Sequence, residues 1–542
     1  MKELIRHEAL PAIRMTHLSS VERELLPLAF GDFLDTAATA TARATFYNSR
    51  AEQEAAIDAV HRDLYEMDRG VYAIALLLPG MTDYSRQIGA IRLLDAPYRD
   101  GVLTAEQEAS VLRGLMNQLP PQRMLKLIGM LRQRRVNNAR TRKLILSVLL
   151  GADNLEFWAV KYRRKIATAL VHAWGRRTAS TLRAVLAKPV EQRDAKERQI
   201  VQRNAYRFVD VDDRDRVEQC VRFVLGDESG LTMRRLVAYR EAKRDFRRGR
   251  ALPLETMEGL RSRFHRDKSN ADVLELTKSQ LTAGQRMAVQ RKASESNVQI
   301  AFDPARQDAV RLYVYAFEMG MTGAIRAELL KKARDAARRL PVRFEHAAVL
   351  LDVSASMVGH ETQARRPISV ALALRDMLAE TADWVTMVSS DGREVAGGEL
   401  IEPVGDTSLA AGLVTLLKQD PDVVFVVTDG YENAPAGRFA EVVRAVRRMG
   451  VETPIHQFSP VFAAESRGVR SLCDAVPGLP VSKPEAIGLG LLKVLFEADV
   501  ERGVAALLGM VRPVIEHFAD NGRTIKDVRD AQRIEEVSHD VS

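Results

Sequence analysis

The first 340 positions carry apolar residues at helical spacing almost throughout. In the segment AEQEAAIDAVHRDLYEMDRG (51–70), apolar side chains fall at positions 55, 56, 57, 60, 64 and 67, close to the spacing of one helix face. Thr104 and Gln107 have the spacing of a capping box, and Gly151 and Gly175 follow apolar runs as C-caps do. Strand-like alternation is almost absent, so the pattern predicts successive helices of about 10 to 20 residues.

So many helices in succession exceed a single bundle and favour an α-solenoid of paired helices. No clean repeat consensus is visible in the sequence, so the repeats would be degenerate and HEAT-like. An irregular helical bundle is the alternative. A solenoid would curve and present a concave face or a hole.

After residue 340 the apolar residues occur in continuous runs instead. EHAAVLLDVSASM (345–357) and DVVFVVTDG (422–430) each place an apolar run before an Asp, as expected for buried parallel strands. The alternation of such runs with helical segments predicts a doubly wound α/β sheet, whose ligand sites form at the carboxyl ends of the strands. The other predicted helices span 365–381, 406–418 and 436–449, and the other predicted strands span 384–390 and 454–459.

We therefore expect an α + α/β protein with an N-terminal helical-repeat solenoid. The predicted domains are a basic helical-repeat domain over 1–340, a doubly wound α/β domain over 341–520 and a mobile polar tail over 521–542. The length of 542 residues agrees with more than one domain.

The composition is that of a globular protein without a membrane span. No apolar run reaches the roughly 18 to 20 residues that cross a bilayer, and the charged N-terminus has no signal-peptide core. The two cysteines, Cys220 and Cys473, are far apart in sequence and lack metal-ligand spacing. We therefore expect a reducing, cytoplasmic location.

The net charge of +8 is unevenly distributed. Residues 1–340 hold 60 Lys and Arg against 42 Asp and Glu, whereas residues 341–542 hold 20 against 30. Residues 101–250 alone hold 33 against 16, a net charge of +17. An excess this concentrated favours a polyanionic partner, most simply nucleic acid. A solvated helical surface that is rich in arginine is the alternative.

Arginine predominates in the basic clusters, and its guanidinium both binds phosphate bidentately and stacks on bases. Trp158 and Trp174 lie among these clusters, but their helical spacing is more typical of a core than of platforms for bases. The candidate RNA-binding residues are Arg132, Arg134, Arg135, Arg140, Arg142, Lys143, Lys161, Arg163, Arg164, Lys165, Arg176, Arg177, Lys243, Arg244, Arg247 and Arg248.

Oxygen-bearing side chains gather where the two apolar runs end. Asp352, Ser354 and Ser356 follow the first run at alternate positions, and Asp429 follows the second. Thr407 follows another loop on the same edge of the predicted sheet. Two carboxylates and three hydroxyls are hard oxygen ligands, which suit Mg²⁺, with Mn²⁺ as the alternative.

These residues resemble the metal-ion-dependent adhesion site of the von Willebrand factor A domain. Asp352-Val-Ser-Ala-Ser356 matches its D-x-S-x-S motif, and the loops with Thr407 and Asp429 are similar to its other two loops in order and spacing. The resemblance implies that Ser354, Ser356 and Thr407 bind the metal directly, and that Asp352 and Asp429 act mostly through water. It also implies that a partner's carboxylate completes the coordination shell. A vestigial site without metal is the alternative.

The whole chain resembles the Ro 60 kDa autoantigen family, the TROVE-module proteins that include bacterial Ro relatives. A basic helical region over 1–340 leads through Leu330-Lys-Lys-Ala-Arg334 directly into VLLDVSASM. The resemblance implies a ring of HEAT-like repeats closed by the A domain. It implies that the ring binds single-stranded 3′ ends of structured or misfolded noncoding RNA, that its outer surface binds a Y RNA, and that an RNA-processing exonuclease is a partner.

No catalytic motif accompanies these sites. The sequence has no P-loop, no G-x-S-x-G and no His pair at metal-ligand spacing, so we do not expect an enzyme. The favoured function is an RNA-binding scaffold of the Ro type that acts in RNA quality control or processing. The alternative is a metal-dependent protein-interaction adaptor that partners a MoxR-type AAA+ ATPase, as bacterial A-domain proteins with helical extensions often do.

Overall fold

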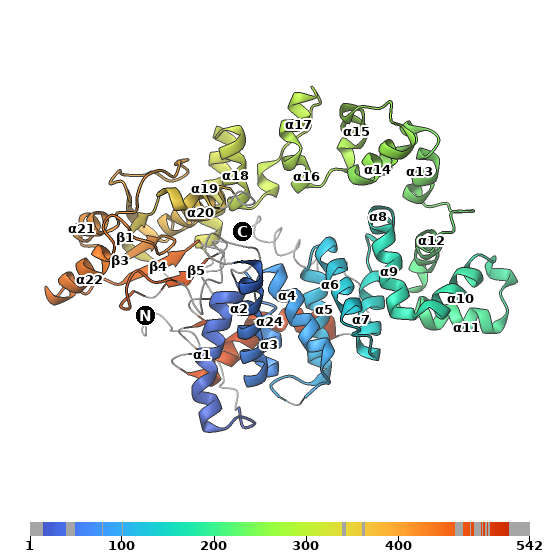
Figure 1. Cartoon of the computed structure of the whole chain (residues 1–542), viewed down its shortest axis with the longest axis horizontal. Coiled ribbons are helices and arrows are strands. Elements are labelled where there is room, and N and C mark those ends of the chain that lie inside the picture. The colour runs from blue at the N-terminus through green and yellow to red at the C-terminus, as the bar shows by residue number, and fades with distance from the viewer. Residues whose placement is uncertain are drawn as a thin grey trace. The chain divides into compact units, whose positions relative to one another are not determined.

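The chain folds as many helices and one small sheet in the computed structural model (Figure 1). It divides into two compact units. The sheet unit comprises residues 1–88 and 303–511, and the helical unit comprises residues 89–302 and 512–542. The structure describes residues 15–38, 49–78, 80–99, 101–338, 343–359, 364–460, 470–476, 478–481, 489, 492–493, 496 and 499–519.

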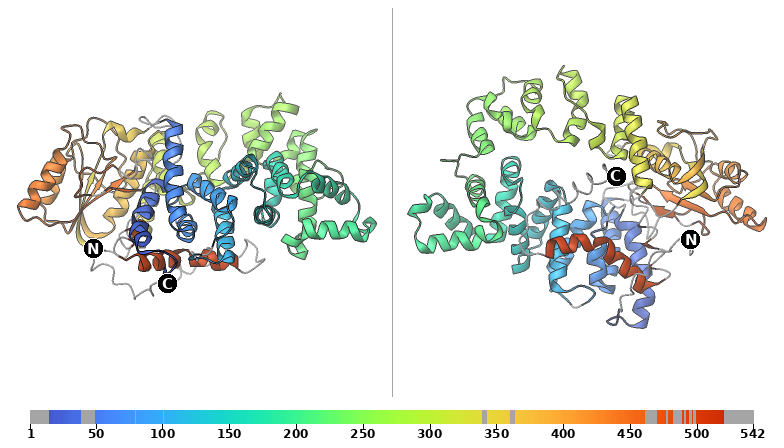
Figure 2. Two further views of the ribbon diagram at one scale, coloured as in Figure 1. Left: turned by 60° about the horizontal axis from the view of Figure 1, so that its bottom comes forward. Right: turned by 180° about the vertical axis from the view of Figure 1, so that it is seen from behind.

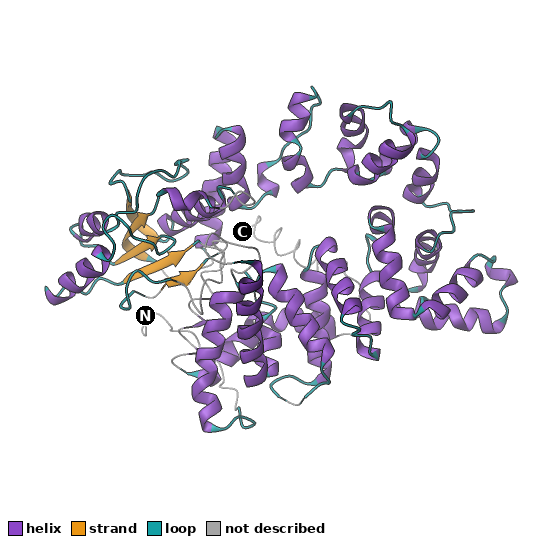
Figure 3. Ribbon diagram, in the orientation of Figure 1, coloured by secondary structure: helices purple, strands orange, loops and turns teal. Residues whose placement is uncertain are grey.

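The sheet has five parallel strands in the order β2-β1-β3-β4-β5. The strands are drawn in orange in Figure 3. Their bounds are β1 Phe344–Leu351, β2 Ala382–Ser389, β3 Val423–Val427, β4 Ile455–Ser459 and β5 Gly478–Pro480. β1 and β3 are the two apolar runs of the sequence, and every residue of β3 is buried. Burial on both faces is typical of parallel strands that helices cover.

The strand order is that of a doubly wound sheet, in which the direction of winding reverses between β1 and β3. Leu351 of β1 is the register partner of Val427 of β3, so these two strands end side by side. The α/β prediction for the C-terminal region is confirmed. The sequence pattern did not predict β5, which has only three residues.

The helices of the sheet unit come from both ends of the chain. They are α1 Ser20–Ala37, α2 Arg50–Met67, α3 Arg69–Ala75, α18 Ala309–Met319, α19 Gly323–Ala337, α20 Arg366–Ala379, α21 Ala410–Leu417 and α22 Arg438–Arg448, while α4 Asp83–Asp95 and α24 Val500–Ala519 cross the division between the units. Leu413 of α21 and Phe439 of α22 form one core with Leu350 of β1. α20 packs against β1, β2 and β3, and α18 and α19 pack against α20.

The N-terminal helix α1 packs against the C-terminal part of the sheet unit. Phe30 stacks on Phe496 with ring centroids 3.9 Å apart, and the Lys493 ammonium lies 2.8 Å from the Asp35 carboxylate. The compact units therefore differ from the predicted division at residue 340, because residues 1–88 and 303–340 belong with the sheet. The change from helices to strands falls where it was predicted, between α19 and β1.

A buried ion pair within α20 is hydrogen-bonded to Tyr313 of α18. Arg375 Nη2 donates to Asp376 Oδ1 at 2.7 Å and to the Tyr313 hydroxyl at 3.0 Å, and that hydroxyl donates to Asp376 Oδ2. All three side chains are almost completely buried. Burial, together with the charge of Asp376, raises the pKa of Tyr313 well above its usual range, so Tyr313 remains a donor. The Gly398 N–H also donates to Asp376 at 3.0 Å, which ties a loop after β2 to this pair.

The helical unit consists of short helices that follow one another in chain order (Figure 2). They are α5 Ala105–Gln118, α6 Pro121–Gln133, α7 Ala139–Leu150, α8 Leu155–Lys161, α9 Arg163–Trp174, α10 Arg176–Leu186, α11 Ala195–Asn204, α12 Arg214–Val224, α13 Arg234–Ala242, α14 Leu254–Phe264, α15 Asn270–Thr277, α16 Ala283–Ala288 and α17 Gln290–Glu295. Short 3₁₀ helices span Val190–Gln192, Tyr206–Phe208, Val211–Asp213, Phe246–Ala251 and Lys278–Gln280. The prediction of a helical N-terminal region is confirmed.

The predicted helix ends are confirmed where caps were expected. Thr104 and Gln107 form the capping box of α5, and Gly151 is the C-cap of α7. Gly175 ends α9 at a φ of +82°, which glycine adopts without strain. Trp174 is buried and its Nε1 donates to the Asn204 carbonyl at 3.1 Å, so this indole belongs to the core.

No helix among the described residues has both the length and the apolar character needed to cross a membrane. Both cysteine thiols are free, and Cys220 is buried. The tail predicted over 521–542 lies outside the described residues.

We predict that Asp376→Ala destabilises the sheet unit by about 3 to 5 kcal/mol, because it leaves the Arg375 guanidinium buried without its counter-charge. Urea unfolding followed by circular dichroism measures the change. Glu380→Ala is the matched control, since Glu380 lies 3.8 Å from Arg334 in a solvent-accessible pair that contributes about 0 to 1 kcal/mol. Equal effects of the two substitutions would contradict the importance of the buried pair.

Candidate functional site

Three loops meet at the edge of the sheet where β1 and β3 end. The Ala355 N–H donates to the Gly405 carbonyl at 3.0 Å, which joins the loop after β1 to the loop before α21. The Ala434 N–H donates to the Thr407 carbonyl at 3.1 Å, which joins that second loop to the loop after β3. α21 begins at Ala410 and not at the predicted residue 406, so Thr407 stays in the loop. The three loops carry all five predicted metal-binding residues, Asp352, Ser354, Ser356, Thr407 and Asp429.

Asp352 lies at the centre of this cluster and is fully buried. Its Oδ1 accepts a hydrogen bond from the Ser354 N–H at 2.9 Å, and its Oδ2 accepts one from the Thr428 hydroxyl at 2.7 Å. Burial, with the nearby charge of Asp429, nevertheless raises the pKa of Asp352 to about 6. The carboxylate is therefore held in position, but its negative charge is not fully compensated.

Asp429 faces the same cluster from the end of β3. The Ser356 hydroxyl and the Tyr431 N–H hydrogen-bond its carboxylate, the second at 3.1 Å. Burial outweighs these bonds and raises the pKa of Asp429. The Ser354 and Ser356 hydroxyl oxygens lie 3.1 Å apart, and Ser356 is exposed, so the cluster is open to solvent on one side.

Thr407 is buried between the other two loops. Its N–H donates to the Asn433 side-chain oxygen at 2.9 Å. Asn433 therefore fixes the backbone of Thr407, and it is a supporting residue that sequence reasoning missed. The motif Asp-Gly-Tyr-Glu-Asn (429–433) contained it, but nothing in its spacing showed that its amide would reach another loop.

The donor set fits a hard divalent cation. It consists of oxygen atoms alone, and the charge of Asp429 lies close enough to Asp352 to raise the cost of ionising that buried carboxyl. A divalent cation with oxygen preference, Mg²⁺ or Mn²⁺, would relieve this repulsion. Among the described residues no group of three or more His, Cys, Asp or Glu side chains is placed to hold a metal, so hydroxyls would have to supply part of the shell.

Gly430 lets two backbone segments approach each other beside the cluster. Its φ is +85°, and a Cβ at this position would lie 2.5 Å from the Arg470 carbonyl oxygen. The same carbonyl accepts a hydrogen bond from Gln457 Nε2 at 2.8 Å. The Arg470 guanidinium lies over the Tyr431 ring, 3.9 Å from its centroid. Sequence reasoning missed Arg470 and Gln457, because only the fold brings β4 and residue 470 next to the loop after β3.

The sixteen candidate RNA-binding residues all lie in the helical unit, and the structure separates them into two groups. Four are partly buried in ion pairs: Arg140 with Glu108, Lys161 with Glu255, and Arg163 and Lys243 with Glu228. These four therefore contribute to packing within the unit. The exposed candidates are Arg132, Arg134, Arg135, Arg142, Lys143, Arg164, Lys165, Arg176, Arg177, Arg244, Arg247 and Arg248.

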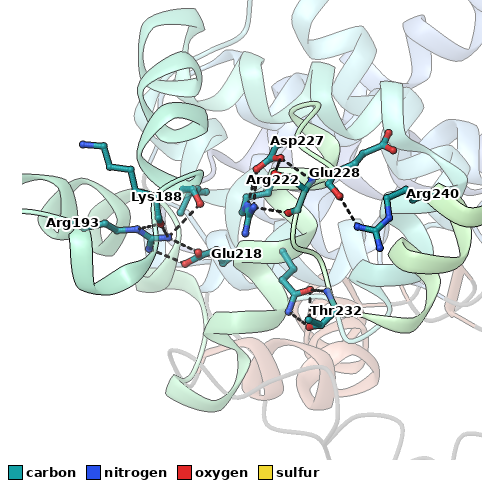
Figure 4. A network of polar contacts seen from close by, with 11 residues as sticks. Lys188, Arg193, Glu218, Arg222, Asp227, Glu228, Thr232 and Arg240 are labelled. Carbon is teal, nitrogen blue, oxygen red and sulfur yellow. Dashed lines mark hydrogen bonds and ion pairs between the residues drawn. The ribbon is translucent and has the colours of Figure 1, made fainter.

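Other arginines of the helical unit also form ion pairs within it (Figure 4). Arg193 lies 2.5 Å from the Glu218 carboxylate, with its side chain only 2% exposed. Arg222 lies 2.9 Å from Asp227. A high arginine count therefore does not by itself give an accessible basic surface.

Two turns bring exposed arginines together around the C-terminal end of α9. Asn137 Nδ2 donates to the His172 carbonyl at 3.0 Å, and the His172 ring lies 3.2 Å from the Val136 carbonyl. Burial lowers the pKa of His172, and the charges of Arg132 and Arg142 lower it further. The turn between α6 and α7 thus meets the junction of α9 and α10. We define the α9 patch as Arg132, Arg134, Arg135, Arg142, Arg176 and Arg177.

A second set of arginines gathers at the C-terminal end of α14. The His265 ring lies 2.6 Å from the Ala242 carbonyl and packs edge-on against Phe246, so the end of α14 adjoins the end of α13. Phe264 is 42% exposed, and the Arg263 guanidinium lies 5.2 Å from its centroid. The sequence prediction missed the α14 residues, which lie beyond the most basic window. We define the α14 patch as Arg244, Arg247, Arg248, Arg263, Phe264 and Arg266.

We predict that Gly430→Ala lowers the thermal unfolding midpoint more than Gly437→Ala does. Both glycines have similar positive φ values, +85° and +79°, so each alanine carries a backbone cost of about 1 to 2 kcal/mol. At Gly437 a Cβ meets nothing within 4 Å, whereas at Gly430 it collides with the Arg470 carbonyl. Equal shifts of the unfolding midpoint in differential scanning calorimetry would show that the backbone at Gly430 has room for a Cβ beside the Arg470 carbonyl.

Comparison with known proteins adds no relative to this description. No protein-family model matches the chain, and no curated protein matches it. The function must therefore be inferred from features of the chain itself. These are a helical N-terminal region, a small parallel sheet near the C-terminus, a five-residue oxygen cluster and two exposed arginine patches.

Proposed function

We propose that this protein is an RNA-binding scaffold of the Ro type. The observation that carries the proposal is the charge of the helical segment 89–302, which holds 43 Lys and Arg against 24 Asp and Glu, a net of +19. The rest of the chain holds 37 against 48. Since the division between compact units nearly coincides with the division of charge, one unit is specialised for a polyanion.

The α9 patch supplies the phosphate-binding part of this proposal. Its six guanidiniums are exposed, and the sequence segments that carry them are joined by hydrogen bonds of Asn137 and His172. Guanidiniums bind phosphate oxygens in bidentate geometry. A curved line of phosphates could therefore be neutralised without any rearrangement of the helices.

The α14 patch supplies a site for an unpaired base. An exposed phenylalanine beside arginines is a stacking platform, and stacking requires a base that is free of its helix. Phe264 therefore favours single-stranded RNA, such as a 3′ end, over a duplex.

We further propose that the sheet unit contains a von Willebrand factor A-like domain whose oxygen cluster holds Mg²⁺. The strand order and the position of the cluster between β1 and β3 support this assignment. When bound, the metal would supply a Lewis-acidic centre for a carboxylate of a partner protein. Ser354, Ser356 and Thr407 would hold it directly, while Asp352 and Asp429 would orient its water shell.

Segment 89–302 is an insertion within the sequence of the sheet unit. Residues 1–88 of the sheet unit precede it and residues 303–511 of the same unit follow it, and Phe30 of α1 stacks on Phe496 within that unit. Both ends of the helical segment are therefore covalently tied to one unit. The ring of HEAT-like repeats, the partnership with an RNA-processing exonuclease and the cytoplasmic location belong to the same proposal, which does not include catalysis.

The complete oxygen cluster favours a second candidate function, a metal-dependent adaptor for an AAA+ ATPase of the MoxR type. In that case the metal site would be the principal binding surface and RNA would bind poorly. Salt dependence separates the two, because counterion release makes RNA affinity fall steeply with salt.

We predict that the full chain binds single-stranded RNA and that Arg142→Ala with Arg176→Ala reduces the salt dependence. Each lost phosphate contact lowers the slope of log K against log salt by about 0.7 for a single strand, so the double substitution lowers it by about 1.4. Fluorescence anisotropy with a labelled oligonucleotide at several salt concentrations measures the slope.

Two variants sharpen this experiment. Phe264→Ala should weaken binding by about 1 to 3 kcal/mol per stacked base and leave the slope unchanged. Arg438→Ala with Arg444→Ala removes two exposed arginines of α22 in the sheet unit and should change neither quantity. A wild-type affinity that hardly varies with salt would overturn the RNA proposal in favour of the adaptor.

We predict that Asp352→Ala abolishes binding of Mn²⁺, used as a probe for Mg²⁺, because the central carboxylate of the cluster is lost. Isothermal titration measures metal binding. RNA affinity should remain within about twofold, since the arginine patches lie in the other unit. Loss of RNA binding together with metal binding would show that the sheet unit takes part in the RNA site.

A further inference from the structure

Two residues, Gln457 and Gly430, hold the backbone of Arg470 beside the oxygen cluster. Gln457 of β4 is fully buried, and its amide binds residues 470–472 at both ends: Nε2 donates to the Arg470 carbonyl at 2.8 Å, and Oε1 accepts from the Leu472 N–H at 2.8 Å. Gly430 packs against the same carbonyl without a Cβ. The backbone of Arg470 is therefore tied to a central strand and to the loop after β3.

The guanidinium of Arg470 is held by the loop that carries Asp429. It lies 3.9 Å from the centroid of the Tyr431 ring, close enough for a favourable cation–π contact. The Tyr431 N–H in turn donates to Asp429 Oδ1 at 3.1 Å. One turn thus positions a carboxylate of the cluster and the ring on which the guanidinium rests. The positive charge of Arg470 reaches the Asp429 carboxyl, whose pKa it lowers against the effect of burial.

The hydrogen-bonding groups of this guanidinium are available to a ligand. Arg470 is exposed, and the described carboxylate that its charge reaches, Asp429, also accepts a hydrogen bond from the Tyr431 N–H. A guanidinium that is stacked on a ring and loosely hydrated is suited to a bidentate contact with a carboxylate.

We infer that Arg470 is a second anion-binding group of the metal site, so that the partner presents two neighbouring acidic side chains, one for the metal and one for the guanidinium. This inference rests on the proposed metal site. The inference adds a requirement on the partner to the proposed metal site. A partner segment with a single carboxylate would bind the metal but leave Arg470 without a ligand.

The charge of Arg470 has opposite effects on the two ligands of the site. A cation beside the cluster repels a divalent metal and so weakens metal binding, whereas it attracts the acidic segment that binds the metal-loaded site. Removal of the charge should therefore strengthen metal binding and weaken binding of the acidic segment. Loss of a merely structural side chain would weaken both.

The test uses the full chain with Arg470→Ala and Arg470→Lys. Mn²⁺ affinity is measured by isothermal titration. Binding of two synthetic peptides is measured at saturating Mg²⁺, one with two adjacent Asp residues and one in which the second Asp is Asn. Arg444→Ala, an exposed arginine of α22 whose Nε bonds only to the Ala440 carbonyl among the described contacts, is the matched control.

We expect Arg470→Ala to bind Mn²⁺ about two- to fivefold more tightly and the two-Asp peptide about three- to fivefold more weakly, the range of a solvent-accessible ion pair. The one-Asp peptide should bind both proteins alike. Arg470→Lys should bind Mn²⁺ as the wild type does, because lysine keeps the positive charge. It should bind the two-Asp peptide with an affinity between those of the wild type and Arg470→Ala, because lysine lacks the bidentate geometry of the guanidinium. Arg444→Ala should match the wild type.

Three outcomes would overturn the inference while metal binding itself persists: equal affinity of the wild type for the two peptides, no binding of either peptide, or parallel weakening of metal and peptide in Arg470→Ala. Failure of the wild type to bind Mn²⁺ would instead overturn the proposed metal site, and the inference with it.

Discussion

Parallel pairing of β1 with β3 is the constraint on which the candidate metal site depends. The register that aligns Leu351 with Val427 makes both strands stop at the same edge, so the residues that follow them, Asp352 and the pair Thr428 and Asp429, must meet. The hydrogen bond from the Thr428 hydroxyl to Asp352, 2.7 Å long, is the direct result. Because the winding reverses between these strands, the connections that follow β1 and β3 lead to opposite sides of the sheet, and their first loops can form a site at this edge.

The cost of this arrangement is electrostatic. Two carboxylates are buried within reach of each other, and burial raises the pKa of each in spite of their hydrogen bonds. The rest of the sheet unit supports this arrangement. Backbone hydrogen bonds join the loops to one another, and the Tyr313 hydroxyl of α18 bonds to the buried Arg375–Asp376 pair of α20, which packs against the sheet. A divalent cation would turn the same repulsion into binding energy.

In the helical unit, arginine has two distinct roles that composition alone does not separate. Some guanidiniums, such as those of Arg140, Arg163 and Arg193, are partly or fully buried against carboxylates and hold helices together. Others are exposed in patches where turns bring distant helix ends side by side. The net charge is the sum of both roles, but only the exposed fraction can meet a phosphate, so the binding capacity follows from the fold of the unit.

The sequence by itself determined the helical region, the β-α alternation and the five oxygen residues, because each depends on local periodicity or on residues adjacent to a strand end. The structure has the predicted helix ends at Thr104 and Gly175, and it has the predicted strands before Asp352 and Asp429. Tertiary structure alone decided that residues 1–88 pack with the sheet, that Thr407 stays outside its helix, that Lys161 and Arg163 pair internally, and that Asn433, Phe264 and Arg470 lie at the candidate sites. These outcomes depend on contacts between segments far apart in the chain, such as Phe30 with Phe496, which no local pattern encodes.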